Sequence, residues 1–558
     1  MIKLSRRSRL GLGVAAPIAA LAALIPGAAM AGAGAHPAAG RATHSFTGFH
    51  LHADPPLGRP APASRVPNIA AGKASPWKPL RHQPSFDPGT MLLASDGTVL
   101  VHAEPPAGGT SAWYKLTPDS KGSYADGTWS KIASMPKGYD PLYFASAILP
   151  NGQMITEGGE YLGGTPAWTS KGAIYNPVTN RWRPVAPPVG WSNIGDAQGD
   201  VLANGTFMLA QACQDCLTPN PVFTENDALF NQSGHDWTTL GGEGKNDPND
   251  EEGWTLLPSG QLLTVDTWLT PTTELFTPAS LSWSSAGNTV KSPVNSNAVE
   301  LGPQVEMPGG NTLVVGGGNG QIAPAKCTAH TPAPTALYNY AAAKWVNGPA
   351  IPTIGGVQYD AADGPGAVLP DGNVLFPVSP CVYNTPIVFF MYDASTHKLV
   401  PVPDVPTAAL DTSYNTRLLV LPNGQILFGD GTHKMQVYTA GGTPNPAWAP
   451  SITGLSSFSF TPGQTASLAG TQLAGLDQGS AYGDDVQSAT NFPIVRITNT
   501  KTGVVTYART SDWTSVSVAP GAASSAKFTI PGTTPAGPST LVVIANGIAS
   551  SPVPVTIG

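Results

Sequence analysis

Acidic side chains recur at one place in a repeated sequence pattern, which is a hydrophobic segment, a turn that ends in glycine, and a second hydrophobic segment. Nine residues before the turn glycine, or beside that position, the repeats offer these carboxylates: Asp196, Glu251, Glu252, Glu300 and Asp363. A cluster of this kind is costly unless it binds a cation, shares protons or meets a polar ligand. The alternative is that the carboxylates are solvated or accept backbone N–H bonds at strand ends, with residues 247–252 forming an exposed acidic loop.

Aromatic and amide side chains stand at the same position in other repeats. Tyr143 and Asn415 occupy it, Tyr414 precedes Asn415, and Trp254 lies near the acidic pair of its own repeat. This combination suits a sugar, because acids and amides hold hydroxyl groups while aromatic faces stack on the ring. Oxygen ligands also suit calcium. We therefore predict a carbohydrate site formed by the five carboxylates and Trp254, with a candidate cation site at Asp196, Glu251 and Asp363.

Other catalytic patterns have less support in the sequence. Cleavage of a glycan would need two carboxyl groups about 5–10 Å apart, a separation that the sequence does not give. No Gly-x-Ser-x-Gly motif and no metal-protease helix motif is evident. The pair of histidines in His50-Leu51-His52 is interpreted as a surface coincidence and not as a metal site.

The repeats themselves predict the elements that position these residues. Seven hairpin turns follow one another at steps of about 50 residues, the spacing of propeller blades, and their glycines are Gly97, Gly152, Gly205, Gly260, Gly310, Gly372 and Gly424. In most copies an aromatic strand and a Trp-bearing strand follow the hairpin, as from Tyr175 to Trp182. Four strands in each of seven repeats predict a seven-bladed kelch-type β-propeller. The tryptophans are interpreted as packing between blades.

The rest of the chain divides into three further regions. Residues 1–35 are basic, then apolar, then small, which predicts a secretory signal peptide. Residues 36–80 form a Pro-rich lead-in, residues 81–447 the propeller, and residues 448–558 an immunoglobulin-like (early-set) β-sandwich with short alternating strands. We expect an all-β, secreted, extracellular monomer with no membrane span.

Charge and cysteine content narrow the partners. Only 11% of the residues are charged, against about 25% in an average globular chain. Removing the four basic residues of the predicted signal takes the formal net charge from −7 to −11, which disfavours nucleic acid and anionic lipid. The four cysteines predict the disulfides Cys213–Cys216 and Cys327–Cys381. A four-cysteine zinc site is the alternative, and it suits an oxidising compartment less well.

From about Pro84 to its end, the chain resembles the galactose oxidase and glyoxal oxidase family in its propeller and C-terminal sandwich. The resemblance implies a secreted copper enzyme that oxidises alcohols or aldehydes and reduces dioxygen to hydrogen peroxide. In that family one tyrosine bears a thioether bond to a cysteine, a second tyrosine is axial, and two histidines complete the copper site. Tyr143 matches the cross-linked tyrosine and Tyr414 matches the axial one.

The other copper-site residues of the family are missing. Asp87-Pro88-Gly89 stands where the family's cysteine should precede Pro-Gly, and Asn415 stands where it has histidine. The second histidine should come from the C-terminal domain, yet no histidine follows His433. In similar bacterial sequences a Tyr-Ala-Arg-Thr stretch leads into a histidine-rich segment, and here Tyr507–Thr510 leads into Ser511-Asp512-Trp513. Copper(II) prefers imidazole nitrogen, so these departures predict that copper-radical chemistry is absent.

Two functions follow from these observations. The first is a secreted binder of extracellular carbohydrate or cell-surface glycan, with no cofactor expected, copper disfavoured and calcium as the cation to test. The second is an enzyme: an extracellular oxidase of alcohols or aldehydes that makes hydrogen peroxide through altered ligands, or a carboxylate-based glycan-processing enzyme. The sequence leaves open whether the chain is an enzyme.

Overall fold

Strands make up nearly all the regular structure of the chain. The computed structural model describes residues 61–219, 221–295, 297–319, 327–482 and 488–558, so the predicted signal peptide, His50-Leu51-His52 and the first part of the lead-in lie outside the described residues. Helix in these ranges is confined to three short turns: η1 (Ala408–Leu410), η2 (Ser413–Asn415) and η3 (Pro446–Trp448). A bilayer-crossing helix takes roughly 20 apolar residues, and the described ranges contain none.

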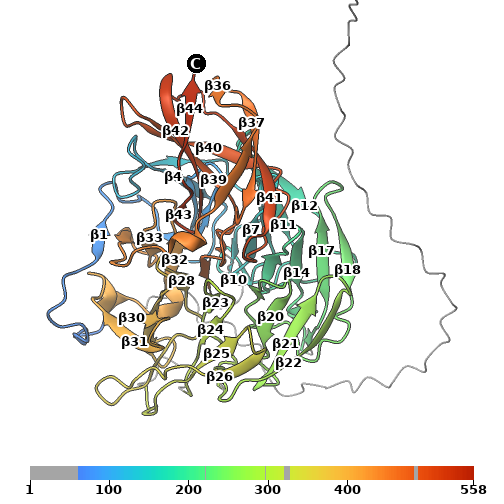
Figure 1. Cartoon of the computed structure of the whole chain (residues 1–558). Helices are drawn as coiled ribbons and strands as arrows, with labels where there is room; N and C mark the ends of the chain where they lie inside the picture. Colours follow the sequence, from blue (N-terminus) through green and yellow to red (C-terminus); the bar gives the residue numbers. More distant parts are fainter. Residues whose placement is uncertain (1–60, 220, 296, 320–326, 483–487) are drawn as a thin grey trace, which may run out of the picture. The chain divides into compact units, whose positions relative to one another are not determined.

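Seven antiparallel sheets form the blades of a propeller (Figure 1); six have four strands, and the sheet of blade 6 gains two short strands, β27 (Tyr359–Asp360) and β38 (Ser480–Ala481). Blades 1 and 2 consist of β2 (Pro88–Leu93), β3 (Val99–Ala103), β4 (Trp113–Thr117) and β5 (Thr128–Lys131), then β7 (Ala145–Ile148), β8 (Met154–Glu157), β11 (Gly172–Asn176) and β12 (Arg181–Val185). Blades 3 and 4 consist of β13 (Gly199–Val201), β14 (Phe207–Ala210), β17 (Asp227–Asn231) and β18 (Asp236–Leu240), then β19 (Thr255–Leu256), β20 (Leu262–Val265), β21 (Thr272–Thr277) and β22 (Ser282–Asn288). Blades 5 and 6 consist of β23 (Gln304–Glu306), β24 (Thr312–Val315), β25 (Thr335–Asn339) and β26 (Lys344–Asn347), then β28 (Gly366–Val368), β29 (Val374–Pro380), β30 (Val388–Asp393) and β31 (Lys398–Val402).

The seventh blade joins two distant parts of the chain. It consists of β32 (Arg417–Val420), β33 (Ile426–Gly429), β34 (Gln436–Tyr438) and, as its outer strand, β1 (Trp77–Pro79). Trp77 lies opposite Tyr438 in the strand register. Its ring also packs on Phe389 and Phe428, with centroids 4.9 and 5.4 Å away. The last residues of the predicted lead-in therefore complete the propeller.

The blades close into a ring in the predicted order. The innermost strand of each blade contacts that of the next, from β2 through β7, β13, β19, β23, β28 and β32 and back to β2. All seven turn glycines have φ between 74° and 89°, the left-handed conformation that these tight turns require and that glycine adopts without steric cost. The strand pairing thus confirms the seven-bladed propeller.

Tryptophans on the outer strands tie neighbouring blades together. The indole N–H of Trp182 in blade 2 donates to the carbonyl of Ala133, just after blade 1, at 2.8 Å. The indole of Trp237 in blade 3 donates to the carbonyl of Ala186 at 2.9 Å. These contacts confirm that the recurring tryptophans serve packing between blades.

The last part of the chain is the predicted immunoglobulin-like sandwich. One path of strands runs β35-β37-β41-β40-β39-β42-β44-β36, with β43 paired to β42. The strands are β35 (Ser451–Leu455), β36 (Ser459–Phe460), β37 (Thr465–Thr471), β39 (Ile494–Asn499), β40 (Val505–Ser511), β41 (Ala523–Thr529), β42 (Gly537–Ala545), β43 (Ile548–Ala549) and β44 (Val553–Ile557). The all-β fold implied by the family resemblance is therefore confirmed.

A segment of the sandwich reaches the inner strands of the propeller. Strand β38 (Ser480–Ala481) pairs with β28, the innermost strand of blade 6. The Gln478 side-chain amide donates to both carboxylate oxygens of Asp200 at 2.9 Å, and its oxygen accepts from the backbone N–H of Leu256 at 2.7 Å. One segment of the sandwich thus contacts the inner strands of three blades.

The remaining short strands lie at blade ends. They are β6 (Pro141–Leu142), β9 (Tyr161–Leu162), β10 (Thr165–Pro166), β15 (Cys213–Gln214), β16 (Val222–Phe223) and β27 (Tyr359–Asp360). Both predicted disulfides, Cys213–Cys216 and Cys327–Cys381, are present, so the four cysteines do not form a zinc site.

Candidate functional site

The predicted ring of side chains coincides with unusual backbone geometry. Tyr143, Glu251 and Asp363 each stand nine residues before a turn glycine and have φ of 50°, 59° and 54°. In blade 3 the left-handed residue is Gly195, directly before Asp196. A left-handed conformation costs a residue with a side chain about 1–2 kcal/mol. Non-glycine residues in this conformation are over-represented at functional sites, where the side chain compensates for the strain.

Backbone hydrogen bonds connect neighbouring blades at or beside these positions. The N–H of Asp363 in blade 6 donates to the carbonyl of Leu301, the corresponding residue of blade 5, at 2.7 Å. The N–H of Gly159 in blade 2 donates to the carbonyl of Gly195 in blade 3 at 2.8 Å. Two of the positions that sequence counting selected, in blades 5 and 6, are therefore in direct contact.

Glu300, Tyr383 and Tyr414 form a buried chain of side chains on one side of the ring. The hydroxyl of Tyr383 donates to Glu300 Oε1 at 3.2 Å. The rings of Tyr383 and Tyr414 meet edge to face with centroids 4.9 Å apart. Tyr383 follows Cys381 and Val382, both with positive φ, and Cys381 is bonded to Cys327. Tyr383, two residues after the disulfide-bonded Cys381, thus contacts both Glu300 and Tyr414.

Tyr143, before the first strand of blade 2, and Asp196, before that of blade 3, are both buried. The ring of Tyr143 packs against Tyr161 with centroids 6.2 Å apart, and both Tyr143 and Asp196 are less than a tenth exposed. Glu251 and Asn415 are half-buried. The ring therefore combines buried phenols and carboxyls with two more accessible members.

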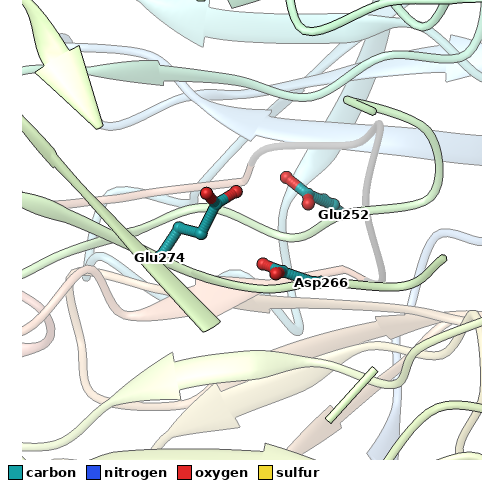
Figure 2. A group of neighbouring side chains, drawn as sticks. All are labelled: Glu252, Asp266 and Glu274. Atoms are coloured by element: carbon teal, nitrogen blue, oxygen red, sulfur yellow. The ribbon is translucent and has the colours of Figure 1, made fainter. Parts of the chain in front are cut away.

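Glu252 lies in a separate, fully buried cluster with Asp266 and Glu274 (Figure 2). One ligand oxygen from each of the three lies within 4.8 Å of the others, a spacing that could hold a metal ion. The ammonium of Lys245 is already there, with Nζ 2.9 Å from both Glu252 Oε1 and Glu274 Oε2. Glu252 is thus a partner of Lys245, and the prediction that it joins the ligand-binding ring is not supported.

Burial dominates the electrostatics of this cluster. Loss of solvation raises the pKa of Asp266 to about 7 and that of Asp247 to about 6, although Lys245 opposes both shifts. Burial likewise raises the pKa of Glu252 well above its usual range. The surrounding carboxylates raise the pKa of Lys245 and outweigh its own desolvation. The cluster is a structural ion-pair network that keeps one lysine charged.

Trp254 also lies apart from the ring. Its side chain is buried in the main hydrophobic core, with its ring centroid 5.7 Å from that of Trp283. The indole N–H lies 3.0 Å from the side-chain oxygen of Gln198 when that amide is turned to satisfy both its ends. The predicted stacking of a sugar on Trp254 is therefore not supported, because the ring is enclosed by other side chains.

The residues around the two tyrosines do not fit a copper(II) ion. Asn415 offers an amide where copper prefers imidazole. His102 is engaged on both ring nitrogens, by Glu104 Oε1 at 2.9 Å and by the carbonyl of Thr110 at 2.6 Å. Both ring nitrogens of His102 are therefore occupied by partners within the protein. Asp87, at the position of the family's cysteine, pairs with His433 at 3.1 Å.

Next to Tyr414 the chain has a buried charge network that sequence reasoning missed. Arg417 lies 4.0 Å from Glu104 and donates to the carbonyl of Tyr414 at 2.7 Å. Despite desolvation, the hydrogen bond and charge of His102 and the charge of Arg417 lower the pKa of Glu104 to about 2. A side chain on residue 89 would collide with Glu104, so Gly89 is required there. The His-x-Glu spacing, with His102 on β3 and Glu104 just after it, is the sequence signal that points to this network.

Comparisons with known proteins give likenesses at low sequence identity. No protein-family model matches the chain, and no curated protein matches it either. Among solved structures, it is similar to one described as a novel fungal alcohol oxidase of the AA5 family in complex with copper, at 14% identity and a TM-score of 0.48, over 87% of this chain and 99% of that one. It is also similar to YjhT, at 17% identity and a TM-score of 0.39, over 57% of this chain and 99% of that one.

Proposed function

We propose that the chain is a secreted propeller protein whose axial ring binds a carbohydrate and that it does not carry out copper-radical oxidation. The observation that supports it most is the retention of Tyr143, Glu251 and Asp363 in a left-handed backbone conformation that glycine would adopt at lower cost. Carboxylates accept from sugar hydroxyls, and the phenols of Tyr143 and Tyr414 supply rigid aromatic surface.

We infer the absence of copper-radical oxidation from the metal-binding groups that the chain offers. Two phenols and an amide lack the imidazoles of the copper site, and His102 is committed to Glu104 and Thr110. Secretion is supported by the predicted signal peptide and by the two disulfides, since disulfides persist in oxidising compartments.

A glycan array followed by calorimetric titration of the best ligand tests the binding function. We expect a glycan signal that falls at least tenfold in affinity in Asp363→Asn, because asparagine tolerates the left-handed backbone and only the charge is lost. Asp512→Asn, at an exposed ion pair with Lys527, should bind like the wild type. A signal unchanged by Asp363→Asn, or no signal on the array, would contradict axial binding.

Incubation with copper tests whether the chain lacks copper-radical oxidase activity. We expect less than one equivalent of tightly bound copper and no peroxide from galactose, glyoxal or simple alcohols. Peroxide release that Tyr143→Phe abolishes would establish the oxidase alternative. Calcium binding is tested by comparing the melting temperature with calcium and with a chelator. If calcium raises the melting temperature of the wild type but not of Asp363→Asn, the ring binds the cation.

A further inference from the structure

A groove of about 670 Å³ lies between blade 1 and the sandwich, and none of the axial ring residues lines it. Blade 1 contributes its hairpin turn at Asp96 and the loop that contains Asp119, and the sandwich contributes β40 and the residues that follow β41. The volume falls in the range of small-molecule sites, about 300–1,000 Å³, and such sites are common at domain interfaces.

Two residues of one sandwich strand face the groove. Tyr507 and Arg509 stand two apart on β40 and both line it, as expected because alternate residues of a strand share a face. Tyr507 packs against the hairpin turn of blade 1, where a side chain on Gly97 would collide with its ring. The Arg509 side chain is half-buried, and its guanidinium forms no hydrogen bond or ion pair with the described residues. Its guanidinium therefore offers its donors to whatever enters the groove.

The acidic side chains of the groove are held in place by their own turns. Asp119 Oδ1 accepts from the backbone N–H groups of Lys121 and Ser123 at 2.9 and 2.8 Å. Asp96 Oδ1 accepts from the N–H and the hydroxyl of Thr98 at 3.1 and 2.6 Å. Neither carboxylate pairs with Arg509 within 4.0 Å in the described residues. The groove thus combines two carboxylates held in fixed positions, Asp96 and Asp119, with the guanidinium of Arg509 as a donor.

The rest of the lining completes a mixed surface. Threonine hydroxyls lie on both walls, at Thr117 and Thr529 among others, and Val505 and Pro531 add apolar surface. Two carboxylates against one guanidinium disfavour an anionic ligand. A neutral sugar matches this lining, because each of its hydroxyl groups can both donate and accept a hydrogen bond and its ring has apolar faces.

We propose that this groove binds a short neutral oligosaccharide, at a site separate from the axial ring. Arg509 donates to the sugar hydroxyls, Asp96 and Asp119 accept from them, and Pro531 and Val505 contact an apolar ring face. A ligand held by both walls also contacts both domains, so its binding stabilises the packing of the sandwich on the propeller by mass action.

Isothermal titration with cellotriose, xylotriose, mannotriose, chitotriose and β-1,4-galactotriose tests the proposal. At least one trisaccharide should bind, and Arg509→Ala and Asp119→Asn should each weaken it at least tenfold. Asparagine can still accept the turn hydrogen bonds of Asp119, so the second variant keeps the loop. Thr533→Trp, at an exposed lining residue, fills the groove without removing a contact and should block binding.

The axial variant Asp363→Asn separates this site from the proposed function. Its affinity for the trisaccharide should match that of the wild type, whether or not the axial ring binds a glycan of its own. Binding that Asp363→Asn abolishes and Arg509→Ala leaves unchanged would overturn the groove site. So would the absence of binding by all five trisaccharides, or preferential binding of trigalacturonic acid, which carries three negative charges. Equal melting temperatures would verify that each variant is folded.

Discussion

At the scale of single residues, the ammonium of Lys245 lies among a group of buried acids. The acids that feel its charge are Glu252, Glu274, Asp266, Asp247 and Asp227. Its Nζ also lies 4.8 Å from the ring of Trp283. Burial leaves these groups no water to replace the ammonium, so the stability of blade 4 depends on this one side chain.

Lys245→Met should therefore be strongly destabilising. Removing one partner of a buried ion pair costs about 3–5 kcal/mol. The loss should be smaller at pH 5 than at pH 8, because the acids, with pKa values raised to about 6–7, are protonated at the lower pH. Melting temperatures at the two pH values measure this, with Lys344→Met at an exposed position of β26 as control. Equal losses at both pH values would contradict the network.

Glu251→Gly tests the strain at the ring. Glycine relieves a left-handed conformation that costs about 1–2 kcal/mol, so we expect a higher melting temperature together with weaker glycan binding. Glu243→Gly, at an exposed turn residue without positive φ, should lower stability by about 0.4–1 kcal/mol, because glycine adds conformational freedom to the unfolded chain. If Glu251→Gly is also destabilising, the side chain contributes more to the fold than to the site.

The sequence could supply the ring positions but not the surroundings of each side chain. Counting from the turn glycines placed Glu251 and Asp363 correctly at strand entrances, because the hairpin repeat fixes the register. Counting could not tell which of Glu251 and Glu252 belongs to the ring. Adjacent residues of an extended chain have different surroundings, and only the fold shows that Lys245 lies beside Glu252. Trp254 failed for the same reason, since its burial depends on Trp283 in the same blade.

At the scale of elements, β1 fills the outer edge of blade 7. Trp77 packs against three rings and donates from its indole to the carbonyl of Pro403 at 2.6 Å. Local patterns predicted every inner hairpin, because turn and strands are adjacent in sequence. They missed β1 and β38, which are short and pair only with residues far away in the chain.

Trp77→Ala should open this edge. Truncating a buried tryptophan costs about 3–5 kcal/mol, and here the lost contacts also hold the closing strand. Trp129→Ala removes a half-buried tryptophan from the corresponding outer strand of blade 1 and should cost less. Thermal unfolding compares the two variants, and limited proteolysis near residue 77 should increase only in the first. Equal effects would mean that β1 adds nothing beyond burial.

At the scale of the whole molecule, the propeller and the sandwich share a group of buried acids. Asp477 on the entering segment is repelled by Glu306 of blade 5, which is also repelled by Asp200 of blade 3. Burial raises the pKa of Asp477 and of Asp200 to about 7. A carboxyl whose pKa is raised by folding stabilises the protein fully below about pH 4, and that contribution is lost as the pH rises through 7.

The contact between the two domains should therefore weaken as the pH rises from 4 to 8. Asp477→Asn should stabilise the protein at pH 8 by an amount on the order of 2–4 kcal/mol for a shift of this size, seen as a higher melting temperature. The stabilisation should be clearly smaller at pH 5 and vanish near pH 4, where the carboxyl is protonated in both the folded and the unfolded state. Asparagine can still accept from the N–H of Gly479, as Asp477 Oδ1 does at 2.8 Å. Asp512→Asn on the surface is the control. A stabilisation of equal size at pH 5 would contradict the assignment.

The pairing of β1 with β34 also sets an order of events in the making of the protein. A chain leaves the ribosome from its N-terminus, and its early parts fold first. Trp77 and its neighbours must then wait, exposed and without their strand partner, until Tyr438 has emerged. Until then the propeller is an open arc with the Trp77 side chain uncovered at its free end. A chaperone that recognises exposed aromatic side chains would find Trp77 during that interval and lose it when the ring closes.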